Sequence, residues 1–179
     1  MNPTDILILP GWQNSGPGHW QTVWEERLGY HRVQQHDWQR PLRGDWNIQL
    51  EEAVLARPGP VLLVAHSLGC VLVAAWAAHS RNTQRVAGAL LVAPPDLERE
   101  DLQPLLPSWT PIERRPLPFP STLVASSNDP YAAESHAQAL ARAWGSQYVP
   151  AGPGGHLNAE SKLGDWPAGQ ALLRALMPA

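Results

Sequence analysis

The sequence predicts an α/β fold in which a parallel sheet is covered by helices on both faces. Short apolar runs alternate along the chain with stretches of helical periodicity. The runs are continuously apolar, as expected for strands that are buried on both faces. Proline and glycine separate the runs from the helical stretches, and no internal repeat interrupts the pattern. We therefore expect a three-layer arrangement whose crossover connections are right-handed.

The composition is that of an ordinary globular protein. With 179 residues, the chain suits one domain with a substantial core, so we expect residues 1–179 to form a single domain. The net charge of -3 and the charged content of 16% favour neither nucleic acid nor an anionic membrane as a partner. The single cysteine, Cys70, lies in an apolar run and is expected to be a buried small hydrophobe. Without a basic leader or an apolar run of membrane-spanning length, a cytoplasmic location is expected.

The expected elements follow one another in a regular order. The predicted strands cover residues 5–9, 31–35, 61–65, 86–93, 121–126 and 147–149. The predicted helices cover residues 20–28, 45–57, 68–78, 131–144 and 165–177. Asp45 is the predicted N-cap of the second helix. Prolines gather between residues 94 and 120 and indicate one long irregular connection.

One apolar run ends in a turn with the composition of a nucleophile elbow. The turn is Ala65-His66-Ser67-Leu68-Gly69, and a second apolar run begins at Leu68. In a nucleophile elbow a buried strand ends, a serine occupies a strained turn and a helix starts at once, which exposes the hydroxyl group above the sheet edge. Gly69 is one small flanking residue, and Ala65 stands where the motif usually has glycine. The first amides of the helix would stabilise an anion formed beside Ser67.

The elbow by itself has a second interpretation, because Ser67 could simply be the N-cap between a strand and a helix. Later loops favour the catalytic interpretation. In an open parallel sheet, functional residues gather at the carboxyl ends of the strands. Asp129 follows the predicted strand 121–126, and His156 follows the predicted strand 147–149. Ser67, Asp129 and His156 thus occur in the order nucleophile, acid and base that α/β-hydrolases use.

The chemistry assigns a task to each member of this predicted triad. A serine hydroxyl becomes a useful nucleophile when His156 removes its proton, and Asp129 would hold the other ring nitrogen. The non-catalytic alternatives are that Asn128-Asp129-Pro130 is only a turn and that His156 is a solvated loop histidine. Three loops in the correct order favour the triad over these alternatives.

Other candidate residues are less favoured. Asp96 follows an earlier predicted strand and is the best substitute for Asp129 as the acid. His66 adjoins Ser67 but is expected to point away from it and to pack or hydrogen-bond beneath the elbow. The remaining histidines with patterns typical of the surface are His31, His36, His79 and His136. No cluster has metal-ligand spacing and no glycine-rich phosphate motif occurs, so neither a metal nor a cofactor is expected.

The loop after the first predicted strand normally supplies the second amide of an oxyanion hole. In this chain the loop begins with Gly11 and Trp12. We therefore expect the oxyanion donors to be the backbone N–H groups of Trp12 and Leu68.

Four motifs resemble those of a known family. They are the loop Gly11-x-x-x-Ser15-x-x-x-His19-Trp20, the elbow, Asn128-Asp129-Pro130 and Gly154-Gly155-His156. Together they resemble, nearly end to end, the small cap-less α/β-hydrolases typified by retinoblastoma-binding protein 9 and YdeN-like bacterial serine hydrolases. The resemblance implies a six-stranded sheet, a serine hydrolase with the triad Ser67, Asp129 and His156, and no cofactor.

Two residues of the first loop have two possible roles. Ser15 and His19 are substrate-pocket candidates, because their loop borders the predicted oxyanion hole. The alternative, which we favour, is that both residues cap the following helix.

These observations predict a serine hydrolase that cleaves small ester-like substrates, or amides or thioesters, through an acyl-enzyme intermediate. Because no large insertion is available as a lid, the pocket is expected to be shallow and open and to favour short acyl groups. No protein partner can be named from the sequence. The rival prediction is a binding protein on a hydrolase scaffold with a vestigial triad, and the intact order of the triad argues against it.

Overall fold

Six strands form one sheet in the computed structural model, which describes residue 2 and residues 5–177. The sheet order is β2-β1-β3-β4-β5-β6, and all neighbouring strands are parallel. The strands are β1 (Ile6–Leu9), β2 (His31–Arg32), β3 (Val61–His66), β4 (Val86–Val92), β5 (Ser121–Ala125) and β6 (Gln147–Pro150). The predicted parallel sheet is thus confirmed. The strand order reverses direction between β1 and β3, and open α/β sheets bind ligands at the carboxyl end of such a switch point.

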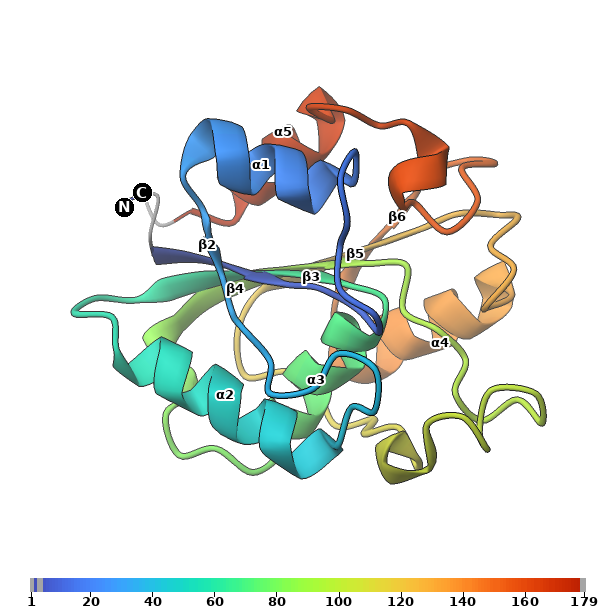
Figure 1. The fold of residues 1–179 in the computed structure, drawn as a ribbon, viewed down its shortest axis with the longest axis horizontal. Helices are drawn as coiled ribbons and strands as arrows, with labels where there is room; N and C mark the ends of the chain where they lie inside the picture. The colour runs from blue at the N-terminus through green and yellow to red at the C-terminus, as the bar shows by residue number, and fades with distance from the viewer. Residues whose placement is uncertain (1, 3–4, 178–179) are drawn as a thin grey trace.

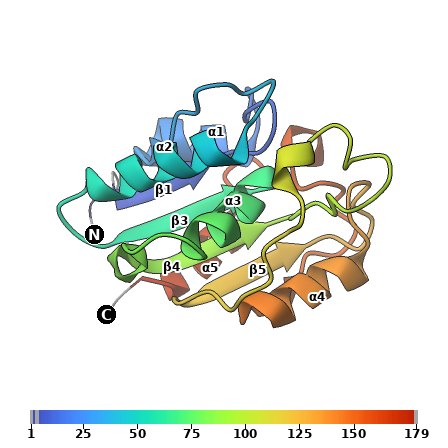
Figure 2. The same cartoon turned by 90° about the horizontal axis from the view of Figure 1, so that it is seen from below.

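Helices cover both faces of this sheet (Figure 1). The α-helices are α1 (Trp20–Leu28), α2 (Arg43–Leu55), α3 (Leu68–Ala77), α4 (Glu134–Trp144) and α5 (Pro167–Ala175). Helices α1 and α5 lie on one face, whereas α2, α3 and α4 lie on the other, as the view in Figure 2 also shows. None of the helices in the described residues is long and apolar enough to span a membrane.

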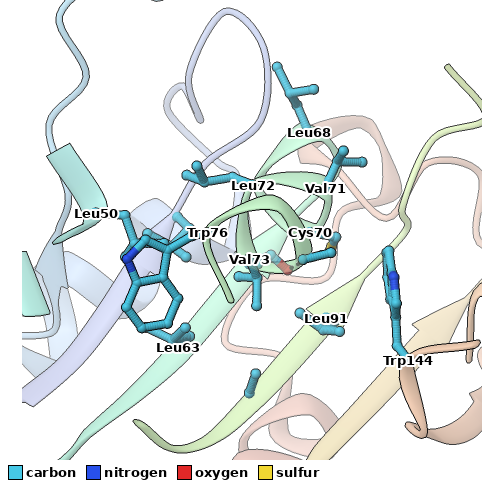
Figure 3. Packing of buried hydrophobic residues seen from close by; sticks show 14 of the residues in the cluster. Leu50, Leu63, Leu68, Cys70, Val71, Leu72, Val73, Trp76, Leu91 and Trp144 are labelled. Atoms are coloured by element: carbon cyan, nitrogen blue, oxygen red, sulfur yellow. Dashed lines mark hydrogen bonds between the residues drawn. The ribbon is translucent and has the colours of Figure 1, made fainter. Parts of the chain in front are cut away.

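The core consists of two apolar layers that the alternation of β3 side chains separates. Leu63 and Ala65 face α2, α3 and α4, whereas Leu62 and Val64 face α1 and α5. Helix α3 is buried from its first residue to Trp76, because neighbouring helices cover it as well as the sheet. Figure 3 shows its side chains packed among those of β3, β4 and α4.

Cys70 lies inside this packing, as predicted. Burial raises the pKa of its thiol, which keeps the thiol protonated and unreactive.

Helix α2 does not begin as predicted. Leu42 is its N-cap residue and makes no side-chain capping bond, so the prediction that Asp45 is the N-cap is wrong. The backbone N–H of Arg43 donates instead to Ser108 Oγ, at 3.3 Å, from the proline-rich connection. Asp45 lies in the first turn, where its carboxylate interacts favourably with the helix dipole. The cap comes from a residue remote in sequence, and therefore local sequence could not predict it.

Helix α4 begins three residues later than expected. The backbone N–H of Tyr131 donates to Asp129 Oδ1 at 2.9 Å, which holds the chain in a turn before Glu134 starts the helix. The predicted strand 31–35 is shorter, since only His31 and Arg32 pair with β1.

Candidate active site

The turn between β3 and α3 has the strained backbone of a nucleophile elbow. Ser67 has φ 54° and ψ -122°, a conformation that residues other than glycine rarely adopt. Its backbone N–H donates to the carbonyl of Val92 on β4, at 2.9 Å, which fixes the turn to the sheet. A side chain at Gly69 would collide with the carbonyl oxygen of Leu9 at the end of β1. Glycine is therefore required where α3 starts against this strand.

The three residues of the predicted triad lie in one hydrogen-bonded line. Ser67 Oγ is 2.9 Å from His156 Nε2, and His156 Nδ1 is 2.8 Å from Asp129 Oδ2 and 3.0 Å from Oδ1. The ionised carboxylate can only accept, so Nδ1 carries the proton and Nε2 is free to accept from the Ser67 hydroxyl. The side chains of His156 and Asp129 are only 9% and 3% exposed, which shields their bond from water. The arrangement can transfer the serine proton to the imidazole.

Asn128 connects the loop that carries Asp129 to the loop that carries His156 through hydrogen bonds. Its Oδ1 accepts from the backbone N–H of Gly155 at 2.8 Å and from the hydroxyl of Ser126, also at 2.8 Å. Ser126 Oγ in turn accepts from the backbone N–H of Gly154 at 2.9 Å. Sequence reasoning quoted Asn128 only as part of a motif and missed Ser126. The position of both residues directly after β5 was the available signal.

Two aromatic side chains hold the loop of His156 from the other side. Trp20 Nε1–H of α1 donates to the carbonyl of Leu157 at 2.8 Å, and His66 Nε2 lies 2.9 Å from the carbonyl oxygen of His156. A carbonyl can only accept, so His66 is protonated on Nε2. His66 is thus buried and hydrogen-bonded, as predicted, but it also belongs to the wall of the cavity described below. Burial lowers the pKa of His66 well below its usual value and keeps the ring neutral.

Asp96 does not serve as the acid of this line. Its Oδ2 lies 3.5 Å from Nδ1 of His136, whereas Asp129 contacts His156. The prediction that His136 is a surface residue is wrong, since its side chain is only 13% exposed. Burial lowers the pKa of His136 although Asp96 opposes this shift. His31, His36 and His79 are exposed, as predicted.

The loop between β1 and α1 lies directly against Ser67. A Cβ atom on Gly11 would be 2.7 Å from Ser67 Cβ, so only glycine allows this approach. The backbone N–H of the next residue, Trp12, has no protein acceptor within the described residues. Leu68 is the first residue of α3, where the amide has no partner inside the helix. Trp12 and Leu68 thus line the same cavity as Ser67, and their role as oxyanion donors stays a prediction.

A buried polar network holds this loop in place. The guanidinium of Arg32, whose side chain is 6% exposed, donates to Asn14 Oδ1 at 2.6 Å and to the carbonyl of Ser15 at 2.9 Å, and it pairs with Glu25. Gln21 is completely buried and donates to the carbonyl of Leu9, the last residue of β1, and to that of Val64 within β3. Sequence reasoning missed both residues. A glutamine on the buried face of α1 was the signal.

Ser15 and His19, the two loop residues with two possible roles, differ in what they do. Ser15 is buried, and its hydroxyl donates to Gln21 Oε1 at 2.7 Å, so it supports the loop and does not cap α1. His19 is the N-cap, and its Nδ1 accepts from the backbone N–H of Gln21 at 3.1 Å. His19 also lines the cavity. Burial, assisted by the positive charge of Arg32, lowers the pKa of His19 to about 3 and keeps the ring neutral.

The cavity at Ser67 has a volume of about 490 Å³, within the range of small-molecule sites. Its lining includes an apolar wall of Pro95, Leu97, Leu102 and Leu106. It also includes the polar residues Gln13, Asn14, His19, Asn158 and Glu160. The proline-rich connection between β4 and β5 supplies this apolar wall, and the shallow, open pocket stays a prediction. Within the described residues, no group of three or more histidine, cysteine, aspartate or glutamate side chains could hold a metal ion.

The sheet order, the strained serine turn and the loops around it are those of the α/β-hydrolase fold, and comparisons with known proteins give the same result. The sequence profile of the serine hydrolase family matches residues 6–175, so the chain belongs to this family. A search of curated proteins finds no match.

Solved structures of hydrolases superpose on nearly the whole chain. A YdeN-like hydrolase from Pectobacterium atrosepticum is 29% identical, with a TM-score of 0.81 over 97% of this chain and 92% of that chain. The ydeN gene product from B. subtilis is 20% identical, with a TM-score of 0.79 over 96% and 97%. A thermophilic esterase from Thermogutta terrifontis, at 17% identity, has a TM-score of 0.66 over 97% and 90%, which shows the shared fold.

Proposed function

We propose that this serine hydrolase cleaves small carboxylic esters through an acyl-enzyme intermediate on Ser67. The observation that carries the proposal is the hydrogen-bonded line of Ser67, His156 and Asp129 at a cavity of about 490 Å³. A line of this kind is the arrangement that activates a serine for acyl transfer.

In the first half of the reaction, Ser67 Oγ attacks the ester carbonyl while its proton moves to His156 Nε2. Asp129 stabilises the imidazolium that forms, because its carboxylate holds the Nδ1–H. The negative oxygen of the tetrahedral intermediate lies between the backbone N–H groups of Trp12 and Leu68. The bond to the leaving oxygen then breaks, and that oxygen takes the proton from Nε2 and departs as an alcohol.

The second half repeats these steps with water. His156 removes a proton from a water molecule, the resulting hydroxide attacks the acyl carbonyl, and Ser67 leaves after it regains the proton. The products are a carboxylic acid and the free enzyme.

The lining of the cavity indicates which esters fit. The leucines of the apolar wall suit an uncharged acyl chain. Among the described residues that line the cavity, Glu160 is the one with a carboxylate side chain, and none is a lysine or an arginine. Neutral esters are therefore favoured over esters of dicarboxylic acids. Thioesters and amides use the same machinery and stay as alternatives, and the cytoplasmic location stays a prediction.

Labelling with a fluorophosphonate probe tests this proposal. The wild-type protein should become labelled, and the Ser67→Ala variant should not, because the probe reacts with activated serine residues. Asp129→Asn should lower the labelling rate by about 10³-fold or more, since the wrong tautomer of His156 then faces Ser67.

A panel of p-nitrophenyl esters, thioesters and anilides then identifies the preferred bond. If a folded wild-type protein is not labelled, the triad is vestigial and the binding-protein interpretation is correct. If labelling occurs but anilides are cleaved fastest, the ester assignment is wrong.

A further inference from the structure

One side chain in the wall of the cavity has a hydrogen-bond donor without a partner. His19 is 4% exposed, and its Nε2 atom is buried without a partner within the described residues. A buried donor that lacks an acceptor costs free energy, which a suitable ligand would recover.

The protonation state of this ring is fixed by its neighbours. Nδ1 of His19 accepts from the backbone N–H of Gln21, so Nδ1 carries no proton. The low pKa of His19, about 3, excludes the doubly protonated ring at neutral pH. The proton of the neutral ring is therefore on Nε2, which makes this atom a hydrogen-bond donor.

The ring of His19 lies against that of His66, which in turn lies against that of His156. The centroids of the His19 and His66 rings are 4.6 Å apart, and those of His66 and His156 are 4.9 Å apart. The leaving group of the proposed reaction departs past His156, which protonates it. The polar residues Asn158 and Glu160 follow His156 in the chain and line the same cavity. Polar groups near His156 suit the leaving group, whereas the leucines suit the acyl chain.

We propose that His19 determines specificity by donating a hydrogen bond from Nε2–H to an oxygen of the leaving group, so that the enzyme prefers esters of hydroxylated alcohols over simple alkyl esters. This inference rests on the proposed esterase function. Since Nε2 of His19 is buried, a bound substrate must displace the surrounding side chains slightly to reach it. Gln13 and Asn14, two neighbouring residues of the same loop with positive φ, also line the cavity.

Two butyrate esters with the same acyl group test the proposal. Glyceryl 1-butyrate carries two hydroxyl groups on its leaving group, and propyl butyrate carries none. We expect the wild-type protein to have a higher kcat/KM for the glyceryl ester by about tenfold, the usual effect of one neutral hydrogen bond. A ratio near one for the wild-type protein would overturn the proposal.

The informative variant is His19→Asn. Asparagine is among the best N-cap residues, so the start of α1 keeps its cap, but its side chain is too short to replace Nε2. The ratio of the two kcat/KM values should fall about tenfold, mainly through KM for the glyceryl ester. His79→Asn is the matched control, because His79 is exposed and does not line the cavity, and it should leave the ratio unchanged.

Other outcomes separate this proposal from the proposed function. If His19→Asn lowers kcat/KM for both esters by the same factor at unchanged thermal stability, His19 does not bind the leaving group and the proposal is wrong. If the wild-type protein reacts with the fluorophosphonate but cleaves neither ester, the proposed leaving-group site is wrong while the activated serine stands. Absence of labelling contradicts the proposed function itself.

Discussion

The two walls of the cavity are built by different interactions. The loop 11–19 is held by buried polar groups, above all the guanidinium of Arg32 and the amide of Gln21. The leucine wall, in residues 95–106, is held by packed leucines and by exposed ion pairs such as Arg99–Asp101. Buried hydrogen bonds fix direction, whereas apolar packing tolerates changes of shape.

This difference fits the chemistry that each wall would perform. The polar loop includes Trp12, whose amide must lie in one place relative to Ser67 if it is to stabilise an oxyanion. The leucine wall needs only to exclude water and accommodate an acyl chain. We therefore expect changes in the polar network to affect stability and kcat together, and changes in the leucine wall to affect substrate choice.

Removal of the buried guanidinium should have the largest effect. Arg32→Ala removes one donor each from Asn14 Oδ1 and the Ser15 carbonyl and the cationic partner of Glu25, and it should lower the free energy of unfolding by about 3 kcal/mol. The displaced loop should also lower kcat by about tenfold or more. Urea unfolding and ester hydrolysis measure the two effects.

Arg27→Ala is the control for this substitution. Arg27 pairs with Asp165 at 2.6 Å, as short as the Arg32–Glu25 pair, but its side chain is 66% exposed. Its loss should cost less than about 1 kcal/mol and leave kcat unchanged. Equal costs for the two variants would contradict the claim that burial gives Arg32 its role.

Acidification should lower the free energy of unfolding through His19, by less than the loss of Arg32 does. His19 titrates near pH 6.5 in the unfolded chain but stays neutral down to about pH 3 in the folded protein. Between these values the unfolded state binds more protons, so the free energy of unfolding falls as the pH decreases below about 6.5. The loss from His19 alone is about 2 kcal/mol at pH 5.

The variant His19→Asn isolates this contribution. Its free energy of unfolding should decrease by about 2 kcal/mol less than that of the wild-type protein between pH 7.5 and pH 5, because the titrating ring is absent. Burial, the main cause of the low pKa of His66, is present in both proteins. Parallel pH profiles for the two proteins would rule out His19 as a source of acid sensitivity.

Substitutions in the leucine wall should change the free energy of unfolding least. Leu102 lines the cavity and is 9% exposed, so Leu102→Ala should cost about 1 kcal/mol, less than a fully enclosed leucine. KM for p-nitrophenyl hexanoate should rise, whereas that for the acetate should change little. Leu105→Ala is the matched control, because Leu105 lies in the same segment but is 55% exposed and does not line the cavity. An identical response to both esters in Leu102→Ala would show that this wall does not contact the acyl chain.

The sequence by itself determined the sheet and the placement of the reacting groups along the chain. Continuous apolar runs such as the one that forms β3 predict strands covered on both faces, and this periodicity is a local property. The serine elbow and the loops that carry Asp129 and His156 were predictable for a related reason. Parallel strands bring their carboxyl ends to one edge, so order along the chain becomes proximity in space.

Only the tertiary structure decided what surrounds these groups. Arg32 holds the loop 11–19, Ser108 accepts a hydrogen bond from the start of α2, and leucines of the proline-rich connection line the cavity. Each of these contacts joins segments far apart in sequence. The role of His19 also required the structure, because one ring nitrogen caps α1 while the other is left without a partner in the described residues. Such contacts depend on the side-chain directions that packing imposes, and the periodicity of the sequence contains no information about them.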